Sequence, residues 1–270
     1  MREVQIVRVT AALSWWNERP VDLVDCVNGI AQVADRVVAV DGAYFRYPNA
    51  TARSDGSQVE AIRETALASG LDPLIIQPSR TWAGEIEKRS ALFALAAAHS
   101  DWVVVVDTDH IISADREGVR KELESATVDV FDVPFRTPYT GSAAEKSATN
   151  WHKEQADNEI RYPLILRALP GLTVVKRHWW YVAYKDGQEV WLSGGDFAPT
   201  ERLQGLTYAE HGILESRYSV EHRCFLRSEE QMLAARAWYN DRVIVVERTG
   251  QEDSVPGLPD PAYDYETVPY

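Results

Sequence analysis

Cysteine is scarce in this chain of 270 residues, which has only Cys26 and Cys224. Two cysteines far apart in sequence exclude a disulfide-based scaffold and are typical of reduced thiols in a cytosolic protein. A secretory signal is not recognisable either, because the first ten residues, MREVQIVRVT, alternate polar and apolar residues like a strand. No apolar run approaches the roughly 20 residues of a membrane span. We therefore expect a cytoplasmic protein without a transmembrane segment.

Basic residues are also in short supply. Lys and Arg number 28 against 41 Asp and Glu, which gives a formal net charge of -13. This balance argues against nucleic acid and anionic membranes as partners, because both bind through excess positive charge. An anionic small substrate stays possible where a metal ion or a local basic patch neutralises it. The length suits one large α/β domain or two small ones.

The first half of the sequence alternates predicted strands and helices. Strands are expected at 4–10, 36–40 and 72–77, and at the valine run of DWVVVVDTDH (101–110), with helices at 20–34, 58–69 and 84–98. Alternation of this kind predicts βαβ units and a mostly parallel sheet flanked by helices, an α/β fold. A strand apolar on both faces is expected in the middle of such a sheet.

The second half is less regular. We expect a helix over 113–126 capped by Ser113, a strand over 128–135, and a long polar loop over 137–157. Residues 162–195 predict short antiparallel strands with a hairpin at 185–187, and 218–223 predicts another strand. A helix capped by Ser228 follows. The acidic, proline-rich tail, 250–270, has no periodicity and is expected to be disordered or to lie along the surface.

The most informative feature is the pair of acids after the valine run. In an extended segment, residues i and i+2 project to the same side, so Asp107 and Asp109 can face one ion while Thr108 points away. Two carboxylates without a sulfur ligand suit Mg²⁺ or Mn²⁺ bridging phosphate oxygens. One acid is expected to ligate directly and the other through water or a sugar hydroxyl. The alternative is a plain strand-end turn with solvated acids.

Several stretches together resemble a known family. They are RVVAVDGAY (36–44), WAGEIEKRSALFALAAAHSDWVVVVDTDH (82–110), LILRALPGL (164–172) and VEHRCFLRSEEQMLAARAWYNDR (220–242). The order of elements, with a hydrophobic strand leading into D-x-D, is similar to the GT-A fold of nucleotide-sugar glycosyltransferases, above all the inverting family 2. The resemblance covers about residues 4–245. It implies a single catalytic domain over 1–249, with a nucleotide-sugar half (1–110), an acceptor half (111–249) and a smaller antiparallel acceptor-side sheet.

The resemblance also implies a donor site. Thr10, Ala11 and Asp41 would hold the nucleoside, although many relatives carry two acids where this chain has only Asp41. Three basic residues would neutralise phosphates or orient Asp107: Arg80, Lys88 and Arg89. For the last two, the alternative is a solvated helix face with i,i+4 pairs to acids such as Glu85.

A histidine from the C-terminal part completes the metal site in many relatives. His222 is the preferred candidate because it follows a short strand and precedes a stretch with the look of the family, and His211 is the alternative. His110, next to the acids, is expected beside the metal ligands or facing the acceptor. A lone histidine is more often an ordinary surface or core residue than a ligand.

An inverting transfer needs a base that takes the acceptor's proton. Asp196, in the glycine-flanked loop SGGDFAP, is the candidate, and His178 is the second choice. For Asp196 the alternative is a simple turn aspartate. An aromatic set can either stack on a sugar or peptide acceptor or form part of the core: Trp179, Trp180, Tyr181 and Trp191.

The predicted function is therefore metal-dependent transfer of a sugar from a nucleoside-diphosphate donor, by family habit a UDP-sugar, to an unknown acceptor such as a protein, a glycan or a small molecule. A D-x-D phosphatase of the haloacid dehalogenase type usually has the motif on its first strand, with Thr or Val where this chain has Ile111. A nucleotidyltransferase normally has a glycine-rich basic segment after that strand, unlike AALSWWNERP (11–20). A non-catalytic carbohydrate-binding relative is the third alternative.

Overall fold

The computed structural model describes residues 7–45, 47–137, 160–175, 180–193, 205–214, 217–223 and 265–267. The helices are α1 (Pro20–Ile30), α2 (Gly56–Ala68), α3 (Glu85–Ala97) and α4 (Arg116–Ser125). The strands of the large sheet are β1 (Val9–Ser14), β2 (Arg36–Val40), β3 (Asp72–Pro78), β4 (Trp102–Asp107), β5 (His110–Ala114), β6 (Val130–Arg136), β7 (Ile160–Arg167), β11 (His211–Ile213), β12 (Tyr218–His222) and β13 (Tyr265–Thr267). A second sheet contains β8 (Thr173–Val174), β9 (Tyr181–Lys185) and β10 (Gln188–Trp191).

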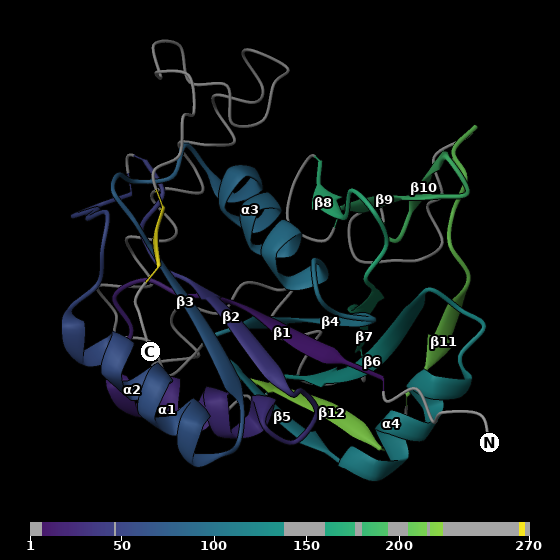
Figure 1. Ribbon diagram of the computed structural model, residues 1–270, viewed down its shortest axis with the longest axis horizontal. Coiled ribbons are helices and arrows are strands. Elements are labelled where there is room, and N and C mark those ends of the chain that lie inside the picture. Colours follow the sequence, from purple (N-terminus) through teal and green to yellow (C-terminus); the bar gives the residue numbers. More distant parts are fainter. Residues whose placement is uncertain are drawn as a thin grey trace.

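The large sheet has the order β13-β3-β2-β1-β4-β7-β6-β12-β5, with β11 paired to β6. Strands β3, β2, β1 and β4 are parallel to their neighbours within this group, and β7 enters antiparallel between β4 and β6. Helix α3 lies on one side of this sheet, and α1 and α2 lie on the other (Figure 1). The predicted α/β class with a mostly parallel central sheet and a small antiparallel sheet is confirmed.

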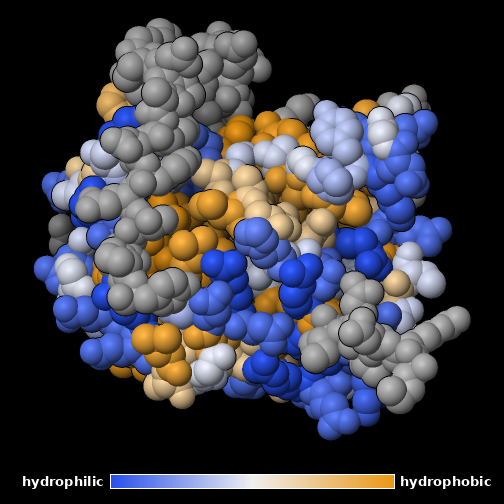
Figure 2. Space-filling model, in the orientation of Figure 1, coloured by the Kyte–Doolittle hydropathy of each residue, from blue (hydrophilic) through white to orange (hydrophobic). Residues whose placement is uncertain are grey.

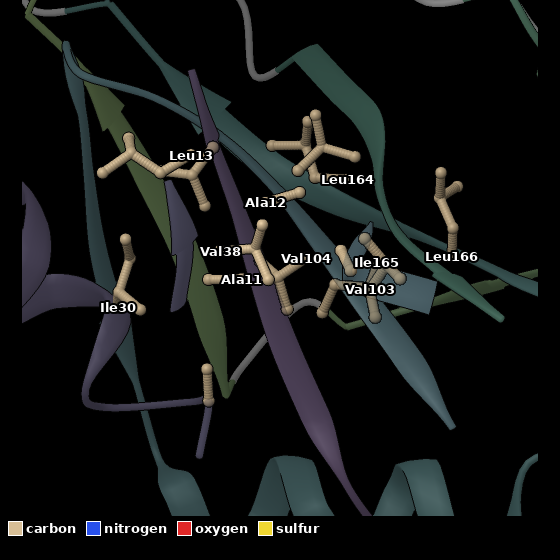
Figure 3. Packing of buried hydrophobic residues seen from close by; sticks show 14 of the residues in the cluster. Ala11, Ala12, Leu13, Ile30, Val38, Val103, Val104, Leu164, Ile165 and Leu166 are labelled. Atoms are coloured by element: carbon tan, nitrogen blue, oxygen red, sulfur yellow. The ribbon is translucent and has the colours of Figure 1, made fainter. Parts of the chain in front are cut away.

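The centre of the sheet explains the valine run. Strand β4 pairs with β1 along six residues, from Val9↔Trp102 to Ser14↔Asp107, and residues 102–106 are buried. Small side chains on β1 pair with larger ones on both neighbouring strands, since Ala11 lies opposite Val37 on β2 and Val104 on β4. Figure 3 shows buried residues of this central part of the sheet. Burial on both faces removes any polar alternation, and the run of valines is the visible result.

The first strand differs from the prediction. It was expected at 4–10, but it spans Val9–Ser14, and residues 1–6 lie outside the described part of the chain. The stretch MREVQIVRVT has the alternation of a half-buried strand, whereas the true strand, VTAALS, is buried along its whole length. A fully buried strand with two alanines carries no period-two signal, so the local pattern favoured the wrong segment.

The segment after the acids also differs. The helix expected from Ser113 begins at Arg116, and Asp115 caps it by accepting a hydrogen bond from the Gly118 amide at 3.2 Å. Residues His110–Ala114 instead form β5, which pairs antiparallel with β12. That pairing joins segments more than 100 residues apart, so nothing local could announce it.

The other elements fall close to their expected positions. The strands at 36–40, 72–77, 128–135 and 218–223 and the helices near 20–34, 58–69 and 84–98 are confirmed, with ends shifted by a few residues. The β9–β10 hairpin turns at Asp186 and Gly187, whose φ angles of 52° and 78° suit the predicted tight turn. In the tail, the short strand β13 pairs with the edge strand β3, which its composition did not predict.

The second sheet packs on α3, where the rings of Phe93 and Tyr181 lie 5.3 Å apart. Apolar residues gather between α3 and β8 on the face in Figure 2, while hydrophilic residues dominate its lower right. Trp180, Tyr181 and Trp191 are buried, so the core interpretation of these aromatics holds, and Trp179 lies outside the described residues. Among the described residues, no helix is long and apolar enough to cross a membrane.

Candidate metal centre

The acidic motif lies on a tight reversal of the chain. Strand β4 ends at Asp107, Thr108 and Asp109 form a turn, and the chain returns as β5. The extended i, i+2 geometry expected for the two acids is therefore wrong, and their carboxylates have different partners. The antiparallel register of β5 and β12 then sets His110 directly opposite His222.

This register brings three side chains together. In Asp109, Oδ2 lies 3.3 Å from Nε2 of His222 and Oδ1 lies 4.0 Å from Nε2 of His110. One potential ligand atom from each of the three lies within 4.8 Å of the others, the one such group among the described residues. A carboxylate and an imidazole nitrogen at this separation are chemically suited to a divalent cation. The donor set therefore fits the expected metal, although with one carboxylate rather than two.

Asp107 belongs to a buried ionic network. The Nη2 group of Arg89 donates to both of its carboxylate oxygens, at 2.8 and 2.9 Å, and Nε of Arg89 donates to Glu85 at 2.9 Å. Burial opposes the charge of Asp107, but Arg89 outweighs it and holds the pKa of that carboxyl below its ordinary value. Burial also opposes the charge of Arg89, and Asp107 and Glu85 raise its pKa well above the ordinary range. Asp107 is thus held in place and ionised, and the guanidinium of Arg89 neutralises its charge.

His110 is buried beside the two acids. Its Nδ1 accepts a hydrogen bond from the Asp107 amide at 3.2 Å, and its ring packs against Phe135 and His222, with centroids 5.2 and 5.6 Å away. Burial lowers the pKa of His110 to about 4, although Asp107 and Asp109 act in the other direction. The ring is neutral at physiological pH.

Two of the three basic residues expected at phosphates, Lys88 and Arg89, are buried, and Arg80 is half-buried. Nζ of Lys88 donates to the carbonyl oxygens of Trp15 and Gly42, at 2.7 and 2.8 Å, and so connects the ends of β1 and β2. Burial lowers the pKa of Lys88 from 10.5 to about 7. Arg80 donates to the Thr81 carbonyl and to Glu87. The solvated-face interpretation of Lys88 and Arg89 is wrong, because both are buried, while the i,i+4 contact of Arg89 with Glu85 is present.

The strand register contradicts the prediction that Thr10 and Ala11 bind the nucleoside. Thr10 and Ala11 lie inside β1, opposite Val103 and Val104, whereas Ser14 is the residue beside Asp107. Four residues of strand place Thr10 about 13 Å from that edge. Its hydroxyl contacts Ser100, and Ala11 has no exposed surface. Neither can reach a ligand at the carboxyl ends of the strands.

Asp41 is buried and already saturated. Its Oδ1 accepts from the Gly42 amide and the Ser54 hydroxyl, both at 2.6 Å. Its Oδ2 accepts from the Ser54 amide at 2.7 Å and from Gln77 at 3.0 Å. Four donors fill the acceptor capacity of a carboxylate. Asp41 therefore stabilises the start of the loop after β2, and this arrangement leaves it no acceptor for a nucleoside.

The other sequence candidates are placed elsewhere. His211 contacts Asp132, with Nδ1 at 3.1 Å from both oxygens. Asp132 precedes Phe135, the neighbour of His222, by three residues, which is about 10 Å along β6. His211 is thus outside the metal centre. Asp196 and His178, the candidates for the base, lie outside the described residues.

Other residues at the centre had no signal in the sequence. A small pocket beside the acids is lined by Glu18, Asp22, Asp25, Thr108, Asp109, Ile111 and Arg223. The Thr108 hydroxyl donates to Glu18 at 2.9 Å, and the Arg223 amide donates to the Asp109 carbonyl at 2.6 Å. Only the position of Arg223 next to His222 could have suggested it. Glu18 reaches the site because the loop after β1 begins at the same sheet edge, where Ser14 lies beside Asp107.

Comparison with known proteins adds little. No family model and no curated protein matches the sequence. Among solved structures, the chain is similar to the bifunctional IspDF from Campylobacter jejuni at 11% sequence identity, with a TM-score of 0.31. The similarity covers 60% of this chain and 41% of that chain. At this level it supports no inference about the present protein.

Proposed function

We propose that the chain is a metal-dependent glycosyltransferase that moves a sugar from a nucleoside-diphosphate donor, with UDP as the preferred nucleotide, to an acceptor with inversion, in the cytoplasm. One observation carries the proposal: Asp109, at the carboxyl end of the central parallel strand, lies 3.3 Å from the imidazole of His222. Ligands of open α/β sheets bind at this edge. Because imidazole prefers transition metals to Mg²⁺, we favour Mn²⁺ over Mg²⁺.

The charges around the pocket support a metal requirement. Four carboxylates line it and one guanidinium of the lining opposes them: Glu18, Asp22, Asp25 and Asp109 against Arg223. Outside the lining, Arg19 also pairs with Asp22, so the acids still exceed the bases by two. Such a surface repels a diphosphate, so an anionic donor binds there only together with a cation. The bound ion would act as a Lewis acid on the departing diphosphate.

Residues of the described chain would bind the ion and orient its ligands. Asp109 and His222 would hold the ion, and His222 is oriented by the contact of its Nδ1 with the Thr137 hydroxyl at 3.3 Å. Asp107, fixed by Arg89, is the acid available to a sugar hydroxyl or a metal-bound water. The net charge of -13 favours a protein, glycan or small-molecule acceptor over nucleic acid.

The test is a thermal-unfolding screen of UDP-, GDP- and dTDP-sugars with and without Mn²⁺. A donor at 100 times its Kd stabilises the folded state by about 2.7 kcal/mol. We expect this stabilisation only with Mn²⁺ present, and its loss in Asp109→Asn and His222→Ala. The matched control is the second His–Asp contact of the chain, so His211→Ala should keep the response. A donor that binds equally well without metal contradicts the proposal.

The products separate the proposal from the other phosphate enzymes. A glycosyltransferase releases the nucleoside diphosphate from the bound nucleotide sugar, whether water or a true acceptor takes the sugar. A phosphatase releases inorganic phosphate, and a nucleotidyltransferase forms or consumes pyrophosphate. Release of nucleoside diphosphate that depends on Mn²⁺ and on Asp109 supports the proposal. Inorganic phosphate or pyrophosphate as the product contradicts it.

A further inference from the structure

The three side chains of the metal centre are not equivalent. We propose that His110 is a positioning residue whose Nε2–H group faces Asp109, so that the cation is ligated by Asp109 and His222 and not by His110. This inference rests on the proposed metal site and assigns its ligands, independently of the sugar that is transferred.

The hydrogen bond from the Asp107 amide decides the state of the His110 ring. A backbone N–H can only donate, so Nδ1 of His110, 3.2 Å away, must offer its lone pair. In a neutral imidazole one nitrogen carries the hydrogen and the other accepts. The hydrogen is therefore on Nε2, the atom that lies 4.0 Å from Oδ1 of Asp109. A nitrogen that carries a hydrogen has no lone pair for a metal ion.

The ring of His222 can adopt the other tautomer, with its hydrogen on Nδ1. The partner of its Nδ1 is the Thr137 hydroxyl, at 3.3 Å, which can accept as well as donate. Nδ1–H can thus donate to Thr137, and Nε2 then presents a lone pair 3.3 Å from Oδ2 of Asp109. The same atom name, Nε2, is a donor in one histidine and a potential ligand in the other.

Burial keeps His110 in its orientation. Its side chain is 3% exposed, and Phe135 and His222 pack against the ring edge to face. A ring flip would remove the acceptor of the Asp107 amide, which a buried site penalises. With Nε2–H on the Oδ1 side of Asp109, the proposed cation position lies between Oδ2 of Asp109 and Nε2 of His222, which are 3.3 Å apart. At 4.0 Å the N–H group acts on the carboxylate as a nearby dipole rather than as a hydrogen-bond donor, and groups that orient a ligating carboxylate affect metal affinity without touching the metal.

The test counts the imidazoles on bound Mn²⁺ by pulsed EPR, using the full-length protein with the metal alone. We expect nitrogen coupling from one imidazole in the wild type, its loss in His222→Gln, and its retention in His110→Gln and His110→Leu. Mn²⁺ affinity should fall about 10- to 100-fold in His110→Leu. In His110→Gln, whose amide can supply the N–H near Nε2, most of this affinity should be recovered. His211→Gln is the matched control and should bind like the wild type.

The outcomes also separate this inference from the proposed function. Two coupled imidazoles in the wild type, or loss of the coupling in a His110 variant, overturn the role of His110 and leave the metal site standing. One coupled imidazole in a protein that transfers no sugar supports the role of His110 and overturns the glycosyltransferase proposal. Absence of Mn²⁺ binding overturns both. The wild-type count requires no variant, so two coupled imidazoles overturn the inference even where a substitution prevents folding. Where one imidazole is coupled, the His222→Gln and His110→Gln spectra show which ring it is.

Discussion

Helices α3 and α4 carry the same charge pattern in opposite surroundings. Each has a Glu followed four residues later by a basic residue, and the contact distances are nearly equal: 2.9 Å for Glu85–Arg89 and 2.7 Å for Glu117–Lys121. The first pair is 8% and 6% exposed, and the second is 81% and 67% exposed. The i,i+4 spacing is therefore visible in the sequence, whereas its surroundings are not.

The difference in burial changes what each charged pair contributes to the protein. On α4 the contact is an ordinary solvated pair, weakened by water and salt. On α3 the pair lies under the strand ends, and Arg89 extends it to Asp107 of the acidic motif. A buried ion network adds little net stability over an apolar core, but breaking it leaves a buried charge without its partner. The α3 pair fixes Asp107 of the acidic motif, and the loss of one member is expected to lower the unfolding free energy strongly.

Among substitutions in these two pairs, Arg89→Met is expected to change the unfolding free energy most. The substitution keeps much of the side-chain volume but leaves Glu85 and Asp107 without their cation. We expect unfolding free energy to fall by about 3–5 kcal/mol. Urea denaturation at neutral pH measures it. A loss no larger than that of a surface substitution would show that water reaches this network.

A pH series on Lys88→Met tests the burial of charge on α3. Unfolded, Lys88 keeps its proton up to its ordinary pKa of 10.5, whereas in the folded protein the pKa is about 7. Between these values the unfolded state binds one proton more, so stability rises with pH in this window by about 1.4 kcal/mol per unit. The penalty for charging Lys88 is fully present only below pH 7.

The measurement compares urea denaturation of wild type and Lys88→Met at pH 7, 8 and 9. The stability of the wild type relative to the variant should increase at each step, because only the wild type has this group. Lys121→Met, at an exposed lysine whose pKa is not lowered, provides the control without this slope. Parallel pH profiles for wild type and Lys88→Met would mean that Lys88 is charged in the folded protein.

The smallest effect is expected for Lys121→Met itself at neutral pH. Both members of this pair are exposed, so loss of the contact is compensated by water. We expect little or no change in unfolding free energy in about 0.15 M salt, because an exposed i,i+4 pair gains little over its hydrated, separated charges. A clear destabilisation, measured by the same urea titration, would contradict the view that only the buried pair on α3 matters for stability.

Much of the fold could be predicted from the sequence because its signals are local. The strand Arg36–Val40, the helix Glu85–Ala97 and the valine run each carry their own pattern of apolar residues and helix formers. The errors at β1, β5 and β13 fall where long-range pairing decides a strand and the local pattern favours something else. Strand β5 is a strand because β12 lies beside it, and the helical pattern after Ser113 gave no sign of this.

The sequence by itself determined the layering of helices on a parallel sheet and the place of Asp107 and Asp109 at the end of its central strand, because hydrophobic period and turn residues act over a few positions. Only the tertiary structure decided the partners of these acids. Asp107 meets Arg89 and Asp109 meets His222 because strand register and helix packing bring them together. Register depends on contacts between distant segments, which no short window of sequence contains.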